Sequence, residues 1–234
     1  MTPKIASYLA DHAPATPCLV LDVDRVEQNY RTLLDALPLA RVYYAVKANP
    51  AAPILQRLVG LGSSFDAASF EEVQFCMDAG AAPSAISFGN TIKKVSAIQR
   101  AHAAGVTMFA FDSAEELEKL AAHAPGARVY CRLLVQNDGA EWPLSRKFGT
   151  TVETARDLML RAAELGMDPY GLSFHVGSQQ TTTGSYETAI GRGWSTGRND
   201  VGRDRGALRD RRRRAVVHAA CRADRERHDE SDDG

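Results

Sequence analysis

The chain has 234 residues, of which 44% are apolar and 24% charged, and its formal net charge is −1 at pH 7. This is the composition of a globular protein, and the near-neutral charge argues against a nucleic-acid partner or an anionic membrane surface. The N-terminal "MTPKIASYLADHAP" lacks the apolar segment of a signal peptide, and no apolar run is long enough to span a bilayer. The four cysteines, at 18, 76, 131 and 221, lack metal-ligand or redox-pair spacing, so we expect a cytoplasmic protein.

The predicted elements begin at residues 16–37, where "TPCLVLDVDRVEQNYRTLLDAL" indicates one strand followed by one helix. Amphipathic stretches then alternate with apolar runs, and most of these stretches end in glycine, as helices commonly do. Ser113 and Glu116 have the spacing of a capping box that opens the fourth of these helices. The apolar runs, each predicted to be a strand, are residues 41–48, 63–69, 85–90, 106–113, 127–134 and 170–178.

This alternation predicts an α/β fold with parallel strands and right-handed crossovers. The spacing between the first five runs is regular, about 21 or 22 residues, which favours a (β/α) barrel over a doubly wound sheet. No G-x-G-x-x-G segment follows the first strand, which further weakens a dinucleotide-binding interpretation. Because a closed barrel needs eight units, we predict an incomplete TIM-type barrel of about six βα units over residues 1–190.

The composition changes near residue 190, and we predict a separate tail over residues 191–234. This segment holds 12 of the 28 lysine and arginine residues, all of them arginine, and few aliphatic side chains. Such a segment cannot bury enough apolar surface to offset the entropy lost on ordering, so it is predicted to be disordered. An out-of-frame reading of a GC-rich gene would give the same composition, and we favour that origin. A basic nucleic-acid arm is the weaker alternative, because aspartates alternate with the arginines.

Polar side chains recur where the predicted strands end. Catalytic groups of (β/α) barrels lie at the carboxyl ends of the strands, so together these side chains predict one shared pocket. Any single strand-end aspartate usually caps the following helix, and we assign that role to Asp112. The strand-end residues are Lys47, Asp66, Asn90, Asp112, Arg132, His175 and Ser178.

Lys47 is the most informative of these residues, because "YYAVKANP" places a lysine at the end of a strand-forming run. The side chain either extends along the surface to water or is a reactive amine held in a pocket. A desolvated amine forms imines, either with pyridoxal phosphate or with a substrate carbonyl, as in aldolase-type barrels. The pattern leaves both chemistries open. His175 would stack on a pyridine ring, and Ser178 beside Gly177 would contact a phosphate.

Seven segments stand in order along the first 190 residues: "YYAVKANP", "SSFDAASFEEV", "ISFGNTIKK", "FAFDSAEELEKLA", "CRLLV", "WPLSRKFG" and "GLSFHVGSQQ". Together they resemble the pyridoxal-phosphate-dependent decarboxylases of basic amino acids, and "WPLSRKFG" points to the bacterial ornithine and lysine/ornithine branch. The resemblance implies an alanine-racemase-like fold, pyridoxal 5′-phosphate as the cofactor, and a homodimer whose sites form between subunits.

The resemblance also implies roles for individual residues. Lys47 matches the catalytic lysine that holds pyridoxal phosphate as a Schiff base, and residues 136–149 match a mobile loop that closes over the site. The other implied site residues are Asp66, an acidic group close to that lysine; Arg132, beside the cofactor; His175, stacked on the pyridine ring; Ser178, at the phosphate; and Glu72 and Lys147, which support the pocket.

The implied reaction is the decarboxylation of a basic amino acid, foremost L-ornithine to putrescine in polyamine biosynthesis, although the residues do not separate ornithine from lysine. Family members continue with a glycine-rich phosphate loop, an acidic partner for the pyridine nitrogen, and a C-terminal β-domain. We find no match to these parts, so we expect the chain as written to have a weakened dimer interface and little activity. Two alternatives stay open: an inert fragment, and a single-barrel pyridoxal-phosphate-binding protein of the homeostasis type.

Overall fold

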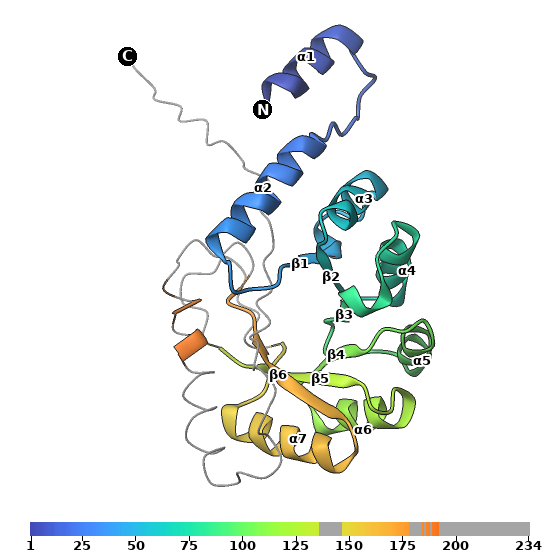
Figure 1. The fold of residues 1–234 in the computed structure, drawn as a ribbon, viewed down its shortest axis with the longest axis vertical. Coiled ribbons are helices and arrows are strands. Elements are labelled where there is room, and N and C mark those ends of the chain that lie inside the picture. The colour runs from blue at the N-terminus through green and yellow to red at the C-terminus, as the bar shows by residue number, and fades with distance from the viewer. Residues whose placement is uncertain (136–146, 178–183, 185, 188, 192–234) are drawn as a thin grey trace.

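The structure, a computed structural model, describes residues 1–135, 147–177, 184, 186–187 and 189–191 (Figure 1). Its strands are β1 (Tyr43–Ala45), β2 (Ser64–Ala67), β3 (Ile86–Phe88), β4 (Met108–Phe111), β5 (Arg128–Leu133) and β6 (Asp168–Phe174). Its helices are α1 (Pro3–His12), α2 (Val23–Ala36), α3 (Ala52–Gly60), α4 (Phe70–Asp78), α5 (Val95–Ala103), α6 (Ala114–His123) and α7 (Val152–Glu164), with 3₁₀ turns η1 (Val46–Ala48) and η2 (Pro83–Ala85).

The six strands form one parallel sheet in the order β1-β2-β3-β4-β5-β6. Each of the six strands predicted at 41–178 is present, and the helices between them line the convex side of the curved sheet (Figure 1). This confirms the α/β fold with parallel strands. Among the described residues, β1 and β6 form the two edges of the sheet. The tail after residue 191 lies outside the described residues, and the predicted division at 190 stays a prediction.

Both faces of the sheet are buried, which explains why the strands are almost continuously apolar rather than alternating. Phe65, Phe109 and Val129 on the outer face belong to the main core, which they share with helix residues such as Leu117. Successive strand residues point to opposite faces. The inner face therefore carries a second cluster, in which Tyr130 packs with Tyr43, Met108 and Ala110. The Tyr130 hydroxyl lies 2.8 Å from Ser87 Oγ, and both side chains are fully buried.

Serine and threonine hydroxyls open four of the helices, among them α1 with Thr2, because they accept hydrogen bonds from backbone N–H groups of the first turn. Ser69 begins α4 and Thr151 begins α7 in this way. Ser113 begins α6 and accepts from the Glu116 N–H at 3.3 Å, so the predicted helix start is confirmed. The carboxylate of Glu116 instead forms ion pairs with Lys93 and Lys119.

The predicted strand at the start of residues 16–37 is wrong. Residues 16–22 have no regular structure, and only the helix α2 forms. A strand needs a partner for its backbone groups, and no described strand pairs with this segment; Leu19 is accordingly 78% exposed. The sequence also did not predict α1, which lies at one end of the molecule and is attached through a Thr2–Asp22 hydrogen bond of 2.8 Å (Figure 1).

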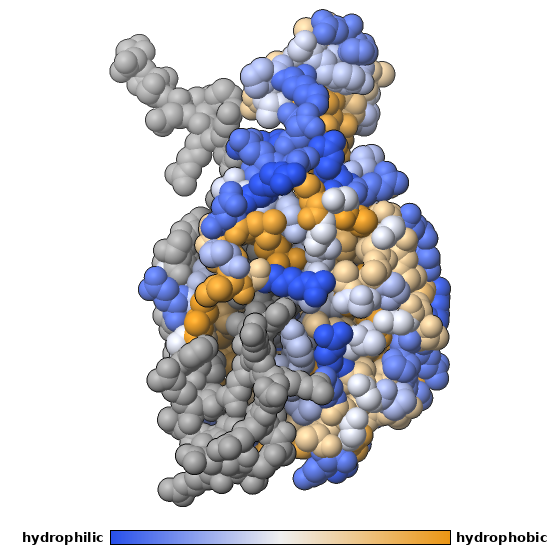
Figure 2. Space-filling model, viewed as in Figure 1, coloured by the Kyte–Doolittle hydropathy of each residue, from blue (hydrophilic) through white to orange (hydrophobic). Residues whose placement is uncertain are grey.

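The surface over α1 and α2 is mostly hydrophilic, with hydrophobic surface between α2 and the sheet (Figure 2). Arg57 of α3 forms an ion pair with Glu27 of α2 at 2.7 Å, which fastens α2 to the first helix after β1.

Within the described part of the chain, no helix has the length and apolar character needed to cross a membrane.

The buried hydroxyl pair on the inner face gives a test of the core. Tyr130→Phe leaves the Ser87 hydroxyl buried without this partner, so we expect the free energy of unfolding to fall by about 1–2 kcal/mol in urea titrations. The double variant Ser87→Ala/Tyr130→Phe removes both polar groups and should be less destabilised than Tyr130→Phe alone. A double variant that loses the sum of both single effects would contradict this account.

Candidate active site

The parallel ladder brings the carboxyl ends of all six strands to one rim of the sheet. Lys47 lies in η1, the turn that directly follows β1. Its side chain is exposed, and among the described residues its amine forms no hydrogen bond or ion pair. The turn itself is well fixed, because Val46 is fully buried and Tyr44 Oη donates to Asn49 O at 3.1 Å. The structure therefore presents an accessible amine on a rigid turn, and desolvation by the described residues is not the source of any reactivity.

Asp66 lies on β2, where Ala45 at the end of β1 is its neighbour in register. Its side chain is only 9% exposed and lies on the inner face, opposite Phe65 and Ala67. Gly89 approaches the carboxylate so closely that a Cβ at position 89 would lie 2.0 Å from Asp66 Oδ1. The loop after β3 thus packs directly against this acid, a contact that the sequence did not predict; the glycine within "SFGN" was its only signal.

Arg132 extends from the inner face of β5, two residues beyond the buried Tyr130. Burial lowers the pKa of its guanidinium, while the charge of Asp112, followed by those of Tyr130 and Asp66, acts in the opposite direction. Burial, the charge of Asp66 and a smaller repulsion from Tyr43 raise the pKa of Tyr130 well above its usual range. Asp66 and Arg132 therefore interact electrostatically around the same tyrosine, on the inner face of the sheet.

Asp112 does not cap α6, so the role predicted for it is wrong. Ser113 caps the helix, and Asp112 Oδ2 instead accepts a hydrogen bond from the Gly149 N–H at 2.8 Å. Gly149 has a φ of +100°, and a Cβ there would lie 2.8 Å from the Leu133 backbone, so only glycine fits this approach. Thr150 N–H donates to Arg132 O at 2.9 Å, which completes the attachment of this segment to the end of β5.

Phe148 lies in the segment that is attached to the end of β5, and its ring contacts two of the predicted site residues. Its ring centroid lies 5.3 Å from Arg132 Cζ and 5.5 Å from Lys147 Nζ, both within the range of cation–π contacts. Lys147 is exposed, and the structure places it beside the Phe148 ring at the rim. The remainder of the predicted mobile loop, residues 136–146, lies outside the described residues.

His175 follows β6 directly and is half-buried. Its Nδ1 accepts a hydrogen bond from the Gly177 N–H at 2.9 Å, which assigns the proton of the neutral ring to Nε2. Arg132 pairs in register with Ser173, so His175 stands at the same end of the sheet as Arg132. Ser178, the predicted phosphate contact, lies outside the described residues.

Glu72 holds the turn that follows β2. Its Oε2 accepts from the Ala68 N–H at 2.7 Å, and its own N–H donates to the α4 cap Ser69 at 3.2 Å. The predicted supporting acid therefore fixes the backbone two residues beyond Asp66. Its negative charge also acts on the buried Cys76, whose thiol pKa rises to about 12, mainly through burial.

A buried lysine, Lys93, ties the loop after β3 to the end of β4. Its Nζ donates to Asn90 O at 2.8 Å and to Ala110 O at 2.6 Å, and forms an ion pair with Glu116 Oε1 at 2.9 Å. Lys119 forms an ion pair with the other oxygen of the same carboxylate. The sequence did not single out Lys93, because a lysine in "TIKKVS" has the appearance of an exposed residue before a helix.

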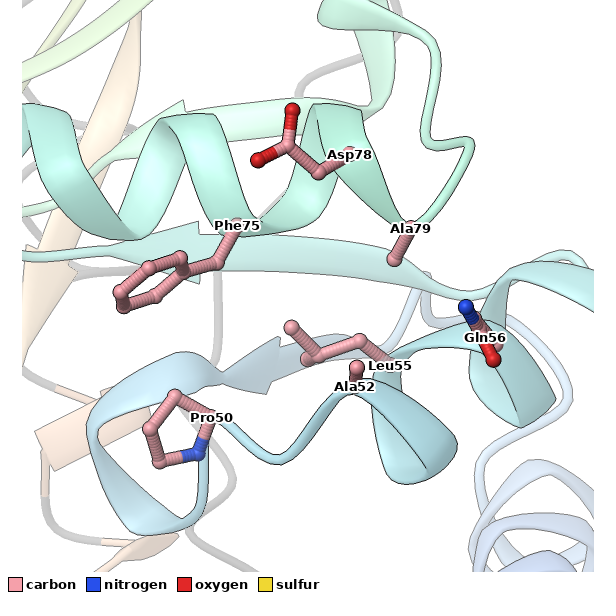
Figure 3. Close-up of a pocket in the computed structure, with 7 residues that line it drawn as sticks. All are labelled: Pro50, Ala52, Leu55, Gln56, Phe75, Asp78 and Ala79. Carbon is pink, nitrogen blue, oxygen red and sulfur yellow. The ribbon is translucent and has the colours of Figure 1, made fainter.

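A shallow crevice of about 160 Å³ lies elsewhere, between α3 and α4 (Figure 3). The side chain of Leu55 lies between the two helices, and the rings of Phe75 and Pro50 lie on the same side of it (Figure 3). None of the predicted site residues lines it. We therefore place the candidate active site at the strand-end rim and not in this crevice.

Comparison with known proteins gives this rim its chemical context. Residues 23–196 match the family model of the pyridoxal-dependent decarboxylases, pyridoxal binding domain. The chain belongs to this decarboxylase family. The match confirms the predicted family and its cofactor, pyridoxal 5′-phosphate, for the domain that contains the described sheet.

Two curated relatives show the range of the family. A lysine/ornithine decarboxylase of Selenomonas ruminantium is 40% identical over 190 residues, which make up 81% of this chain and 48% of that protein. Antizyme inhibitor 2 of Xenopus laevis is 37% identical over 171 residues, or 73% of this chain and 38% of that protein. The chain thus spans half or less of the length of these relatives.

Two solved structures share the fold. An SrLDC mutant in complex with PLP matches with a TM-score of 0.77 at 39% identity, covering 82% of this chain and 50% of that one. A lysine/ornithine decarboxylase from Vibrio vulnificus, complexed with putrescine, matches with a TM-score of 0.73 at 32% identity over the same shares of the two chains. These matches confirm the predicted barrel-type α/β architecture of the N-terminal part.

The Asp112–Gly149 hydrogen bond gives the second test. Asp112→Ala removes the acceptor, and we expect faster hydrogen–deuterium exchange of a peptide covering residues 147–151, with a loss of about 1–2 kcal/mol of unfolding free energy. Asp112→Asn keeps a side-chain oxygen and should retain most of the protection. Equal exchange in the alanine and asparagine variants would contradict the assigned acceptor.

The buried ammonium predicts a pH dependence. Burial lowers the pKa of Lys93 from 10.5 to about 8, against the opposing charge of Glu116. Because the unfolded chain then binds more protons between pH 8 and 10.5, the free energy of unfolding should rise with pH through this window, by about 3 kcal/mol in total. The measurement is urea unfolding at pH 8 and pH 10, compared with Lys93→Met/Glu116→Gln, which removes both charges of the buried pair. The rise should be smaller in the variant, and parallel curves would contradict the prediction.

Proposed function

We propose that this domain binds pyridoxal 5′-phosphate covalently through Lys47 and serves the decarboxylation of a basic amino acid. L-ornithine is the first proposed substrate, with putrescine as the product and polyamine biosynthesis in the cytoplasm as the setting; L-lysine is the second. One observation carries the proposal: in a chain of the pyridoxal-dependent decarboxylase family, an accessible amine stands on a rigid turn at the strand-end rim.

The residues of the rim fit this cofactor in their chemistry. Lys47 supplies a primary amine that can condense with an aldehyde, and His175 supplies a planar ring whose Nδ1 is already an acceptor. Asp66 and Arg132 supply one negative and one positive group on the inner face of the sheet. When bound, pyridoxal phosphate supplies an electron-withdrawing ring that stabilises the negative charge left at Cα when CO₂ departs.

Each rim residue has a proposed part in this arrangement. Lys47 holds the cofactor and returns to it after turnover, and His175 orients its ring by stacking. The half-buried guanidinium of Arg132 places positive charge beside it. Asp66 lies close to the lysine turn and balances that charge, while Glu72 and Lys147 fix the neighbouring backbone and rim. Ser178 is proposed as the phosphate contact on the strength of the sequence alone.

A second candidate function is binding without decarboxylation. It is favoured by the relative named antizyme inhibitor 2, whose name refers to another protein rather than to a reaction. A pyridoxal-phosphate carrier is one form of this alternative, and an inert chain that neither binds nor decarboxylates is a separate one. A homodimer is part of the decarboxylase proposal.

The proposed cofactor attachment is tested by borohydride reduction. The full chain is incubated with pyridoxal phosphate and reduced, and its peptides are analysed by mass spectrometry. We expect one dominant modified site, Lys47, because its amine is both exposed and held on a fixed turn. The matched variants are Lys47→Arg, which should lose the modification, and Lys94→Arg, which removes an exposed lysine with no proposed role in the site and should keep it. Modification spread evenly over surface lysines, or retained in Lys47→Arg, would refute the assignment.

The choice between the two candidate functions needs a separate assay. Release of labelled CO₂ from carboxyl-labelled L-ornithine and L-lysine is measured with the same chain preparation. Release that depends on Lys47 supports the decarboxylase, and the ratio of the two rates gives the substrate preference. Attachment at Lys47 without CO₂ release favours the binding alternative, and absence of both favours an inert chain.

A further inference from the structure

Lys93 is the most unusual charged residue of the described chain, because its side chain is 0% exposed. Its three partners come from three different parts of the fold: the backbone of the loop after β3, the backbone of β4, and the carboxylate of Glu116 on α6. The Phe88 ring lies 5.7 Å from the ammonium and contributes a fourth contact. Directional contacts of this kind fix one position for the loop.

Stability alone does not account for such an arrangement. Replacing a buried ion pair by apolar side chains of similar volume is often neutral or stabilising, because taking two charges out of water is costly. What an ammonium adds over a methionine is direction, since its donors must point at particular carbonyl oxygens. The backbone held in this way is Asn90, the residue immediately after Gly89.

The contacts continue from Asn90 to the candidate site. Gly89 N–H donates to Ala67 O at 2.9 Å, and Asn90 Nδ2 donates to Ala68 O at 3.3 Å, so the loop lies along the end of β2. Gly89 also packs against the Asp66 carboxylate, where even a Cβ would come within 2.0 Å of Oδ1. A shift of this loop therefore either presses on the Asp66 side chain or releases it.

We propose that Lys93 is a positioning residue of the active site: it fixes Asn90 and Gly89, and through them the carboxylate of Asp66. In this proposal Lys93 acts through the loop that it holds at Asn90, and not on Asp66 directly. The inference rests on the proposed function in one respect, namely that Asp66 serves the cofactor bound at Lys47. It predicts that the geometry of the site depends on Lys93 even when the stability of the fold does not.

The experiment compares the position of the loop after β3 in variants whose folding is checked independently. Lys93→Met alone leaves Glu116 buried beside a single partner and risks unfolding. The working variant is therefore Lys93→Met/Glu116→Gln, in which both charges are removed while Lys119 retains an amide oxygen to bind. The matched control is Glu116→Gln, which keeps both carbonyl contacts of Lys93. Thermal unfolding should show that both variants are folded at the assay temperature.

Two readouts test the role of Lys93. In the double variant, hydrogen–deuterium exchange of a peptide covering residues 86–92 should rise by about tenfold, and the apparent Kd of pyridoxal phosphate, titrated by reductive trapping at Lys47, by about tenfold. In Glu116→Gln both should stay near the values of the unchanged chain. Wild-type exchange and wild-type affinity in the folded double variant would overturn the proposal.

A double-mutant cycle with Asp66→Asn tests whether Lys93 acts on pyridoxal phosphate binding through Asp66. If Lys93 acts through Asp66, adding Lys93→Met/Glu116→Gln to Asp66→Asn should weaken pyridoxal phosphate binding little further. Additive losses of affinity would overturn the route through Asp66. If the unchanged chain does not attach pyridoxal phosphate at Lys47, the proposed function fails. In that case the exchange of residues 86–92 alone decides whether Lys93 fixes the loop.

Discussion

The parallel pairing of the six strands is the constraint on which the rest of the structure depends. Because each strand pairs with its sequence neighbour in the same direction, all carboxyl ends meet at one rim. Burial of both faces then leaves that rim as the place where polar side chains of the inner face can gather. Lys47, Asp66, Arg132 and His175 come from four different strand ends, and only this ladder brings them to one edge.

The polar groups of the rim divide into two kinds. Some fasten the loops to the sheet through a backbone group: Glu72 holds Ala68, Asp112 holds Gly149, and Lys93 holds Asn90. The others, led by Lys47 and His175, stand directly after the strands β1 and β6 and do not hold a loop in this way. This division explains why a strand-end charge is not by itself a catalytic residue. It also gives the glycines at 89 and 149 a common purpose, since each allows a loop to approach the rim where a side chain would collide.

The family match and the residues of the rim point to the same cofactor, but the family match alone does not identify the reaction or its substrate. Pyridoxal phosphate carries the difficult part of the chemistry, so the protein contributes attachment, orientation and charge. The described rim has groups suited to these three tasks. Relatives of comparable identity bear names as different as lysine/ornithine decarboxylase and antizyme inhibitor 2. The reaction and its substrate therefore depend on details that the fold alone does not fix, and they rest on the proposals above.

The sequence by itself determined the alternation of strands and helices, the family, and the positions of the strand-end residues, because apolar periodicity and short motifs are local. It could not show that residues 16–22 stay irregular, because a strand forms only where another backbone pairs with it. It assigned Asp112 to a helix cap, whereas the fold brings Gly149, 37 residues away, to its carboxylate. It also left Lys93 among the surface residues. Only the tertiary structure could bury that lysine, because its partners on β4 and α6 come from distant parts of the chain.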